Sequence, residues 1–124
     1  MTLSHLELFQ RYMHAGPITR SATAYANLFT EDGVYEAPLE GLRLAGRDAI
    51  ERGIAAVQER PAPPGAMNPG ASRFTLHDTA DPDVFVTEID AVYDGPDGPT
   101  TVSLVQIFRR SGDRLRELRD YFRP

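Results

Sequence analysis

Few side chains in this sequence could carry covalent chemistry. All thirteen basic residues are arginines, so no lysine is present to form a Schiff base or to bind a nucleotide phosphate. Cysteine is absent as well, which excludes thiol nucleophiles and thiolate metal sites. The remaining chemistry is that of carboxylates, tyrosines, histidines and amides, which move protons or hold oxygen atoms.

The three histidines, His5, His14 and His77, have no spacing typical of a metal site, and no carboxylate-rich calcium loop occurs. No glycine-rich run could hold a phosphate group, and no serine stands in a nucleophile-elbow context. We therefore predict neither a metal nor an organic cofactor.

Several titratable side chains fall on predicted strands. Glu88 and Asp90 alternate with apolar residues and therefore share one face of their strand, for which we favour a solvated or subunit-facing location. Glu36 and His77 could face either solvent or a pocket. On the pocket interpretation, Glu36 and His77 are substrate-binding residues.

The elements that must position these groups begin with helices. Apolar residues recur at helical spacing in three stretches, and Ser4 with Glu7 forms a capping-box pattern at the start of the first. Gly16-Pro17 is expected to break the helical pattern between the first two stretches. Helices are predicted over residues 4–14, 18–29 and 47–57.

Runs rich in β-branched and aromatic residues, separated by turn signals, predict strands in the rest of the chain. Residues 61–71 contain four prolines and two glycines, and this composition predicts a long stiff loop. The strands are predicted over residues 33–38, 73–79, 84–93, 100–110 and 114–122.

This order of elements predicts a single α+β domain over residues 1–124 with a mostly antiparallel sheet. The strand at 100–110 is apolar on both faces, so we expect a second copy of the chain to cover the outer face. A net charge of -5 disfavours nucleic acid as a partner. No apolar run approaches the ~18 residues of a membrane span and no basic leader is present, so no membrane association and a cytoplasmic location are expected.

Three strings carry a family resemblance. They are residues 25–38 (Tyr-Ala-Asn-Leu-Phe-Thr-Glu-Asp-Gly-Val-Tyr-Glu-Ala-Pro), 44–50 (Leu-Ala-Gly-Arg-Asp-Ala-Ile) and 119–124 (Arg-Asp-Tyr-Phe-Arg-Pro). Together they resemble the SnoaL-like branch of the nuclear-transport-factor-2-like superfamily, which includes ketosteroid isomerase. The resemblance covers almost the whole chain. It implies a conical fold, with three N-terminal helices packed on a curved mixed sheet that encloses an apolar pocket, and a homodimer formed through the sheet.

The resemblance also implies site residues. Tyr12 is similar in position to the tyrosine that donates a hydrogen bond to the substrate oxygen in ketosteroid isomerase, and Gln106 to a second donor. Ala37 stands where that enzyme has its aspartate base. SnoaL-like cyclases and phenazine-biosynthesis proteins place an acidic residue on the last strand, which implies Asp120 as the acid or base of this chain.

The turn between the last two strands decides whether Gln106 and Asp120 share a face. A three-residue loop would pair Gln106 with Leu118 and keep Asp120 on the same face. A two-residue turn would pair Gln106 with Arg119 and point Asp120 to the other face. We favour the longer loop because it gathers apolar, substrate-binding residues around the two polar groups. These residues are Leu104, Phe108, Leu118 and Phe122.

These expectations favour a pocket protein for an apolar small molecule. The leading hypothesis is a cofactor-independent isomerase or cyclase acting on a polyketide-, terpenoid- or steroid-like substrate. In it, Asp120 moves a proton next to a carbonyl while Tyr12 and Gln106 hold the oxygen. The alternative is a non-catalytic ligand-binding or dimeric assembly module, which Ala37 favours. A weaker alternative is an epoxide hydrolase, a branch of the superfamily that uses an Asp-Arg-Asp set.

Overall fold

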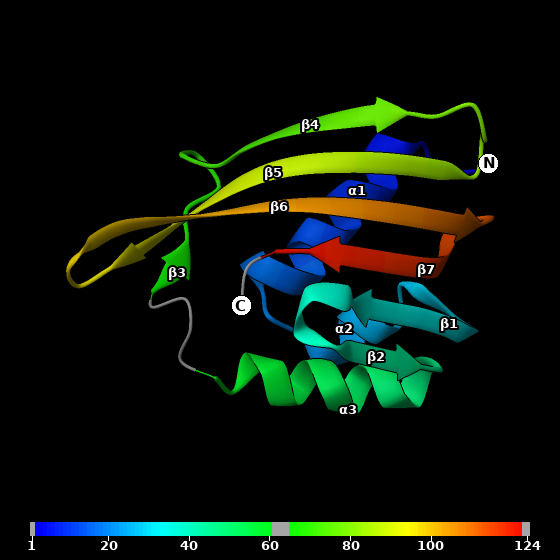
Figure 1. Cartoon of the computed structure of the whole chain (residues 1–124), viewed down its shortest axis with the longest axis horizontal. Helices are drawn as coiled ribbons and strands as arrows, with labels where there is room; N and C mark the ends of the chain where they lie inside the picture. Colours follow the sequence, from blue (N-terminus) through cyan, green and yellow to red (C-terminus); the bar gives the residue numbers. More distant parts are fainter. Residues whose placement is uncertain (1, 61–64, 123–124) are drawn as a thin grey trace.

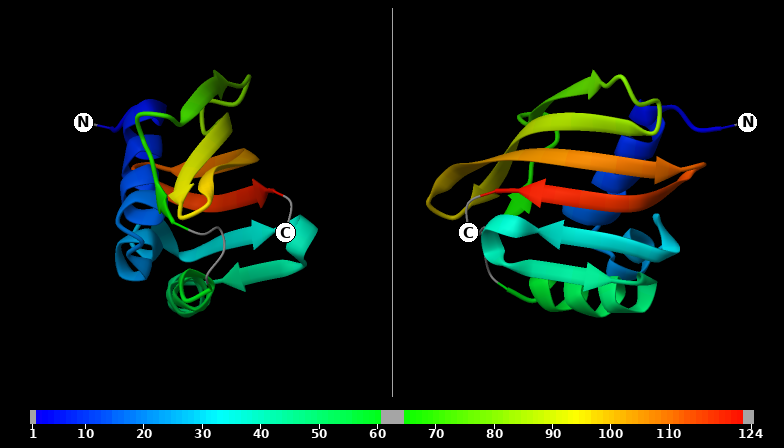
Figure 2. Two further views of the ribbon diagram at one scale, coloured as in Figure 1. Left: turned by 90° about the vertical axis from the view of Figure 1, so that its left-hand side faces the viewer. Right: turned by 45° about the vertical axis from the view of Figure 1, so that its right-hand side comes forward.

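The computed structural model describes residues 2–60 and 65–122. Its strands form one mixed sheet in the order β2-β1-β7-β6-β5, with β3 and β4 both paired to β5 (Figure 1). Helices α1 and α2 lie against one face of this sheet, and α3 runs along β2 (Figure 2). The elements are α1 His5–Met13, the π-helix His14–Ile18, α2 Ala22–Ala26, β1 Phe29–Ala37, a 3-10 turn Pro38–Glu40, β2 Leu42–Ala45, α3 Arg47–Gln58, β3 Ala66–Met67, β4 Arg73–Asp78, β5 Val84–Gly95, β6 Gly98–Ser111 and β7 Arg114–Tyr121.

The predicted fold class is confirmed, and so is the start of the first helix. The Ser4 hydroxyl accepts a hydrogen bond from the Glu7 amide at 3.1 Å, and the Glu7 carboxylate accepts one from the Ser4 amide at 3.1 Å. This reciprocal pair satisfies two of the amides that a helix leaves unpaired at its first turn. Helix α1 buries Leu8, Phe9 and Tyr12 against the sheet. Tyr12 therefore faces inward from the last turn of the helix.

The predicted break at Gly16-Pro17 is wrong. The chain continues from α1 into a π-helix, in which the amide of Thr19 donates to the carbonyl of His14 at 2.9 Å. Hydrogen bonds of this wider turn span five residues, and the turn accommodates a proline inside it. The second helix is shorter than predicted because Ser21 caps it at residue 22, and Phe29 already belongs to β1.

All five predicted strands are present, with ends shifted by a few residues. Two short strands were not predicted. Strand β2 follows a tight turn at Gly41, whose φ of 67° suits glycine, and pairs with the edge of β1. Strand β3 pairs with the end of β5 and lies within the stretch predicted as a loop over 61–71, so that prediction is wrong at residues 66–67. Residues 61–64 of that loop lie outside the described residues.

The register of β6 and β7 differs from both sequence-based alternatives. Ser111 pairs with Arg114 across a two-residue turn, which corrects the three-residue loop that we favoured. A β-bulge then adds one residue to β7, because the next two pairs are Arg110 with Leu115 and Arg109 with Glu117. The bulge brings Gln106 and Asp120 back to the same face of the sheet. Gln106 pairs directly with Asp120, so both side chains point to the helix-covered face of the sheet.

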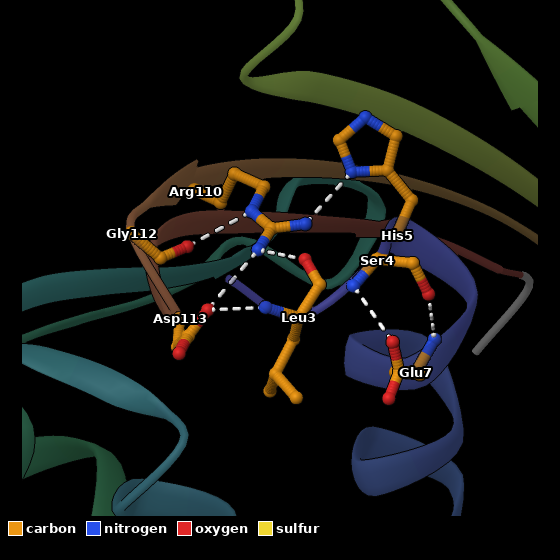
Figure 3. Close-up of polar contacts among 7 residues, drawn as sticks. All are labelled: Leu3, Ser4, His5, Glu7, Arg110, Gly112 and Asp113. Carbon is orange, nitrogen blue, oxygen red and sulfur yellow. Dashed lines mark hydrogen bonds and ion pairs between the residues drawn. The ribbon is translucent and has the colours of Figure 1, made fainter. Parts of the chain in front are cut away.

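A buried arginine ties the start of the chain to the turn between β6 and β7 (Figure 3). The guanidinium of Arg110 donates to the carbonyl of Leu3 at 2.6 Å and to that of Gly112 at 2.9 Å. It also contacts the Nδ1 atom of His5 at 3.0 Å, and Asp113 accepts the Leu3 amide at 2.7 Å. These bonds compensate the charge of a side chain that is only 5% exposed, and they fix where α1 begins.

In the described part of the chain, no helix is both long enough and apolar enough to cross a membrane.

Candidate active site

Three inward-facing residues form a row across the middle of the sheet. Thr87 on β5 pairs with Gln106 on β6, which pairs with Asp120 on β7. Thr87 and Gln106 are completely buried and Asp120 is 6% exposed. Buried polar groups need partners, so their hydrogen bonds define the chemistry of this region.

A chain of hydrogen bonds runs from the sheet to helix α1. The Thr87 hydroxyl donates to Oε1 of Gln106 at 2.9 Å, which fixes the orientation of the amide. The Gln106 Nε2 atom then donates to the hydroxyl of Tyr12 at 2.6 Å. Because that hydroxyl accepts from Gln106, its own hydrogen can be donated elsewhere, and acceptance of a hydrogen bond strengthens a hydroxyl as a donor. Tyr12 is therefore a directed donor for an oxygen atom.

Asp120 is held by a second tyrosine. The hydroxyl of Tyr35, on β1, donates to Oδ2 of Asp120 at 2.9 Å. The other oxygen, Oδ1, is buried and has no hydrogen-bond partner among the described residues. Burial raises the pKa of Asp120 to about 6, although the hydrogen bond from Tyr35 and the nearby amide of Gln106 oppose the shift. Such a carboxyl group can be protonated or ionised near neutral pH.

The surrounding tyrosines remain protonated. Burial raises the pKa values of Tyr12, Tyr25 and Tyr35 well above the usual value for a phenol, and the nearby charge of Asp120 adds to the shift. The rings of Tyr12 and Tyr25 pack edge to face with their centroids 5.6 Å apart, and Tyr25 packs on Tyr35 in the same way at 6.0 Å. The three side chains thus supply neutral hydroxyl groups in a well-packed aromatic wall.

These groups line one side of a cavity of about 530 Å³. The volume lies within the ~300–1,000 Å³ of typical small-molecule sites. Most of the remaining wall is apolar and comes from the π-helix, α3 and strands β3, β5 and β6. Apolar lining residues include Met13, Ile54, Met67, Ile89, Leu104 and Phe122.

This arrangement can move a proton and stabilise the charge that results. Asp120 lines the cavity and has in Oδ1 an acceptor without a partner among the described residues, and Tyr12 offers a polarised donor. A carbonyl compound that placed its oxygen at Tyr12 and its α-hydrogen at Asp120 would meet both groups needed for enolisation. The geometry suits proton transfer within an apolar molecule.

The structure brings together the three residues implied as catalytic, Tyr12, Gln106 and Asp120. It does not bring Glu36 or His77 to the cavity, which corrects the expectation that they bind substrate. Glu36 points to the outer face of the sheet and pairs with Arg119 at 3.2 Å, because it alternates with the inward-facing Tyr35. His77 lies exposed on β4, 2.8 Å from Glu88 on the same outer face.

The four apolar candidates divide into two pairs. Leu104 and Phe122 line the cavity as predicted. Phe108 and Leu118 face inward but lie in the core and do not line the cavity, so the expectation that they contact substrate is wrong. Phe108 stacks on Phe85 with centroids 4.7 Å apart, which fills the space beneath α1. The cavity is confined to the other end of the sheet.

Sequence reasoning missed several residues of the site. Tyr25, Tyr35 and Tyr93 line the cavity, and Thr87 lies behind it and holds the Gln106 amide. Tyr35 could have been found, because it alternates with Glu36 and stands two residues before the apolar Ala37. Thr87 required the register of β5 and β6, which the sequence does not specify. Among the residues that the structure describes, no cluster of three or more His, Asp or Glu side chains could hold a metal ion.

The chain matches one family of known proteins over most of its length. The family model described as a SnoaL-like domain matches residues 9–118. A protein with a ketosteroid isomerase-like fold from Catenulispora acidiphila superposes with a TM-score of 0.73 and 19% identity, over 98% of this chain and 88% of that one. No curated protein gives a significant match.

Two further solved structures share the fold. A protein from Sphaerobacter thermophilus is 26% identical with a TM-score of 0.67, over 98% of this chain and 97% of the other. A phenazine biosynthesis-related protein from Pseudomonas aeruginosa is 17% identical with a TM-score of 0.72, over 94% of this chain and 77% of the other.

Proposed function

Because the chain belongs to the SnoaL-like domain family, we propose that it is an isomerase or cyclase that transfers a proton within an apolar, oxygenated substrate. Asp120 is the acid or base, and Tyr12, supported by Gln106, holds the substrate oxygen. The observation that carries the proposal is Oδ1 of Asp120, a buried carboxylate oxygen without a partner among the described residues, in a cavity with a directed phenol donor. The size and apolar lining of the cavity favour a polyketide-, terpenoid- or steroid-like ring system.

The position of Asp120 offers a substitute for the base that Ala37 cannot provide. Glu36 pairs with Arg119 across the parallel strands β1 and β7, so the next residues, Ala37 and Asp120, lie beside each other on the inner face. The carboxylate is therefore displaced by one strand from the position that the family resemblance implies for the base. It remains on the inner face of the sheet, beside the cavity.

The test is hydrogen exchange at carbon. We expect the protein to accelerate deuterium incorporation next to the carbonyl of 2-tetralone in D₂O, followed by proton NMR. The rate should rise with pH and level off above about 6, because the ionised form of Asp120 is the base. Asp120→Asn should lower the rate by at least ~100-fold and Tyr12→Phe by ~10-fold or more.

The matched control is Glu51→Gln, which removes a carboxylate from an exposed position on α3 that does not line the cavity. Its exchange rate should equal that of the original chain. Circular dichroism must show that Asp120→Asn is folded. A folded Asp120→Asn variant with an unchanged rate would remove Asp120 from the mechanism.

The second candidate function is ligand binding without catalysis, and the absence of a carboxylate at Ala37 favours it. A ligand that binds in the cavity and is recovered unchanged, with no exchange at carbon, would support this candidate. We also infer a homodimer formed through the outer face of the sheet, where Val105 is 41% exposed and the described helices give no cover.

A further inference from the structure

The cavity has one charged group at each end. Among its described lining residues, only Asp120 and Arg20 carry charge. Asp120 is buried at the inner end, whereas Arg20 is exposed and therefore lies where the cavity meets solvent. A ligand that fills the cavity would pass from a guanidinium at the entrance to a carboxyl group at the inner end.

The backbone of Arg20 is held in a conformation that arginine rarely adopts. Its φ is 52°, and it is the only described residue other than glycine with a positive φ. Hydrogen bonds of 2.9 Å from the Arg20 amide to Gly16 and from the Ser21 amide to Ala15 hold the chain in this turn. Glycine is the usual residue at such a position after a helix. An arginine there, on the wall of a cavity, indicates that its side chain has a use.

The guanidinium spans the entrance between two elements. Its Nη2 atom donates to the carbonyl of Gln58, at the end of α3, while the backbone of Arg20 follows the π-helix. A guanidinium has five N–H donors, so this bond leaves others for a ligand. None of the ion pairs formed by the described residues involves Arg20.

Tyr93 lines the same cavity as the two charged groups. It comes from β5, and burial raises its pKa, so its hydroxyl stays a neutral hydrogen-bond donor. The charge of Arg20 opposes this shift in the pKa of Tyr93. A ligand in the cavity can therefore meet a second donor besides the guanidinium of Arg20.

We propose that Arg20, assisted by Tyr93, binds a carboxylate on the substrate, so that the protein takes an apolar ring compound with a carboxylate at one end and the reacting oxygen at the other. The carboxylate suits the planar guanidinium, which can donate two parallel hydrogen bonds to it. The position of the reacting oxygen rests on the proposed function. The carboxylate contact rests only on Arg20, Tyr93 and the cavity.

A purely structural role for Arg20 makes a different prediction. If the side chain only joined the π-helix to α3 through Gln58, its loss would loosen the entrance and weaken every ligand alike. A carboxylate site predicts selective loss. The two roles are therefore separated by a pair of ligands that differ in charge and hardly in shape.

The probes are 2-naphthoate and its neutral counterpart 2-naphthamide, with binding measured by isothermal titration calorimetry. The original chain should bind the naphthoate about tenfold more tightly, and added salt should reduce this preference. Arg20→Gln should abolish the preference by weakening naphthoate about tenfold while leaving naphthamide unchanged. The control, Arg116→Gln, removes the same charge from an exposed position on β7 and should leave both affinities unchanged.

Equal weakening of both ligands in Arg20→Gln, or no preference for naphthoate in the original chain, would overturn the carboxylate site. Asp120→Asn should still prefer naphthoate, because the charge at the entrance is intact. An original chain that prefers naphthoate but catalyses no proton exchange would reject the proposed reaction and keep the carboxylate site. An original chain that catalyses exchange but shows no preference for naphthoate would reject only the carboxylate site.

Discussion

The pKa of Asp120 links the stability of the fold to the protonation state that proton transfer would require. In an unfolded chain its carboxyl group has a pKa near 3.8, whereas burial in the folded protein raises the pKa to about 6. Folding therefore favours the protonated form, and the ionised form needed by a base destabilises the native state. The hydrogen bond from Tyr35 to Oδ2 reduces this cost without removing it.

The sign of this effect gives a testable pH dependence. The contribution of protonated Asp120 to stability is fully present below about pH 4 and is lost as the pH rises through 6. Between pH 4 and pH 8 the original chain should lose up to about 3 kcal/mol of unfolding free energy relative to Asp120→Asn, whose amide does not titrate.

Urea denaturation of both proteins at a series of pH values measures that difference. The same comparison with Asp97→Asn, which alters an exposed carboxyl group in the turn between β5 and β6, should show no comparable change. A flat difference for Asp120→Asn would mean that the native carboxyl titrates as it does in the unfolded chain.

The residues of the site were only partly predictable. Tyr12, Gln106 and Asp120 came from a family resemblance, and the structure brings them together because their elements lie as that family arranges them. Glu36 and His77 were assigned from residue type alone, and the pleat turned both outward. The alternation of Tyr35 with Glu36 could have placed Tyr35 on the inner face, but a tyrosine on a strand, such as Tyr93, looks the same whether it fills a core or borders a cavity.

At the scale of elements, the turn after the π-helix places an arginine in a backbone conformation that favours glycine. An L-residue in the left-handed region is strained by contact between its Cβ atom and the backbone, and glycine is not. Arg20 occupies such a position at φ 52°. The strain affects any residue with a Cβ atom at position 20. Its effect on stability can therefore be measured in variants that lack the guanidinium.

We expect Arg20→Gly to be more stable than Arg20→Ala by about 1 kcal/mol, because both variants lack the side chain and differ only in backbone preference. Chemical denaturation measures the difference. The control is the same pair at Arg52, an exposed residue inside α3, where alanine should be the more stable by about 1 kcal/mol. The same order at both positions would show that Arg20 is not strained.

Elements with strong local signals were predictable, and those fixed by tertiary pairing were not. The capping box marked the start of α1, and runs of β-branched and aromatic residues between turn signals marked the strands from β4 to β7. The bulge in β7 was missed because both alternatives assumed a regular ladder. Leu115 and Leu118 are both completely buried although three residues apart, a spacing that a regular strand cannot place on one face.

At the scale of the molecule, the sheet has two unlike faces. The described helices cover the inner face, and the outer face carries Val105 beside the cross-strand neighbours Glu88 and Tyr121. Apolar and charged groups are mixed there, as at many interfaces between subunits. This is the face through which we infer that two copies associate.

Val105→Glu tests that inference. A new carboxylate beside Glu88 would be buried next to a like charge in a dimer, so the variant should be a monomer of 13.7 kDa while the original chain has twice that mass. Light scattering after size-exclusion chromatography measures both masses. Leu6→Glu is the control, because Leu6 is 44% exposed, against 41% for Val105, and lies on helix α1 on the opposite side of the sheet. A monomeric original chain would contradict the proposed dimer.

The parallel pairing of β1 with β7 sets the order in which the molecule can be completed during synthesis. A ribosome makes β1 early and β7 last, yet β7 lies between β1 and β6 in the finished sheet. A nascent chain that ends before residue 114 therefore has two halves of a sheet with no strand to join them, and it has no Asp120. Asp120 joins the cavity in the same event that closes the sheet, so under the proposed function an incomplete chain would lack its acid or base.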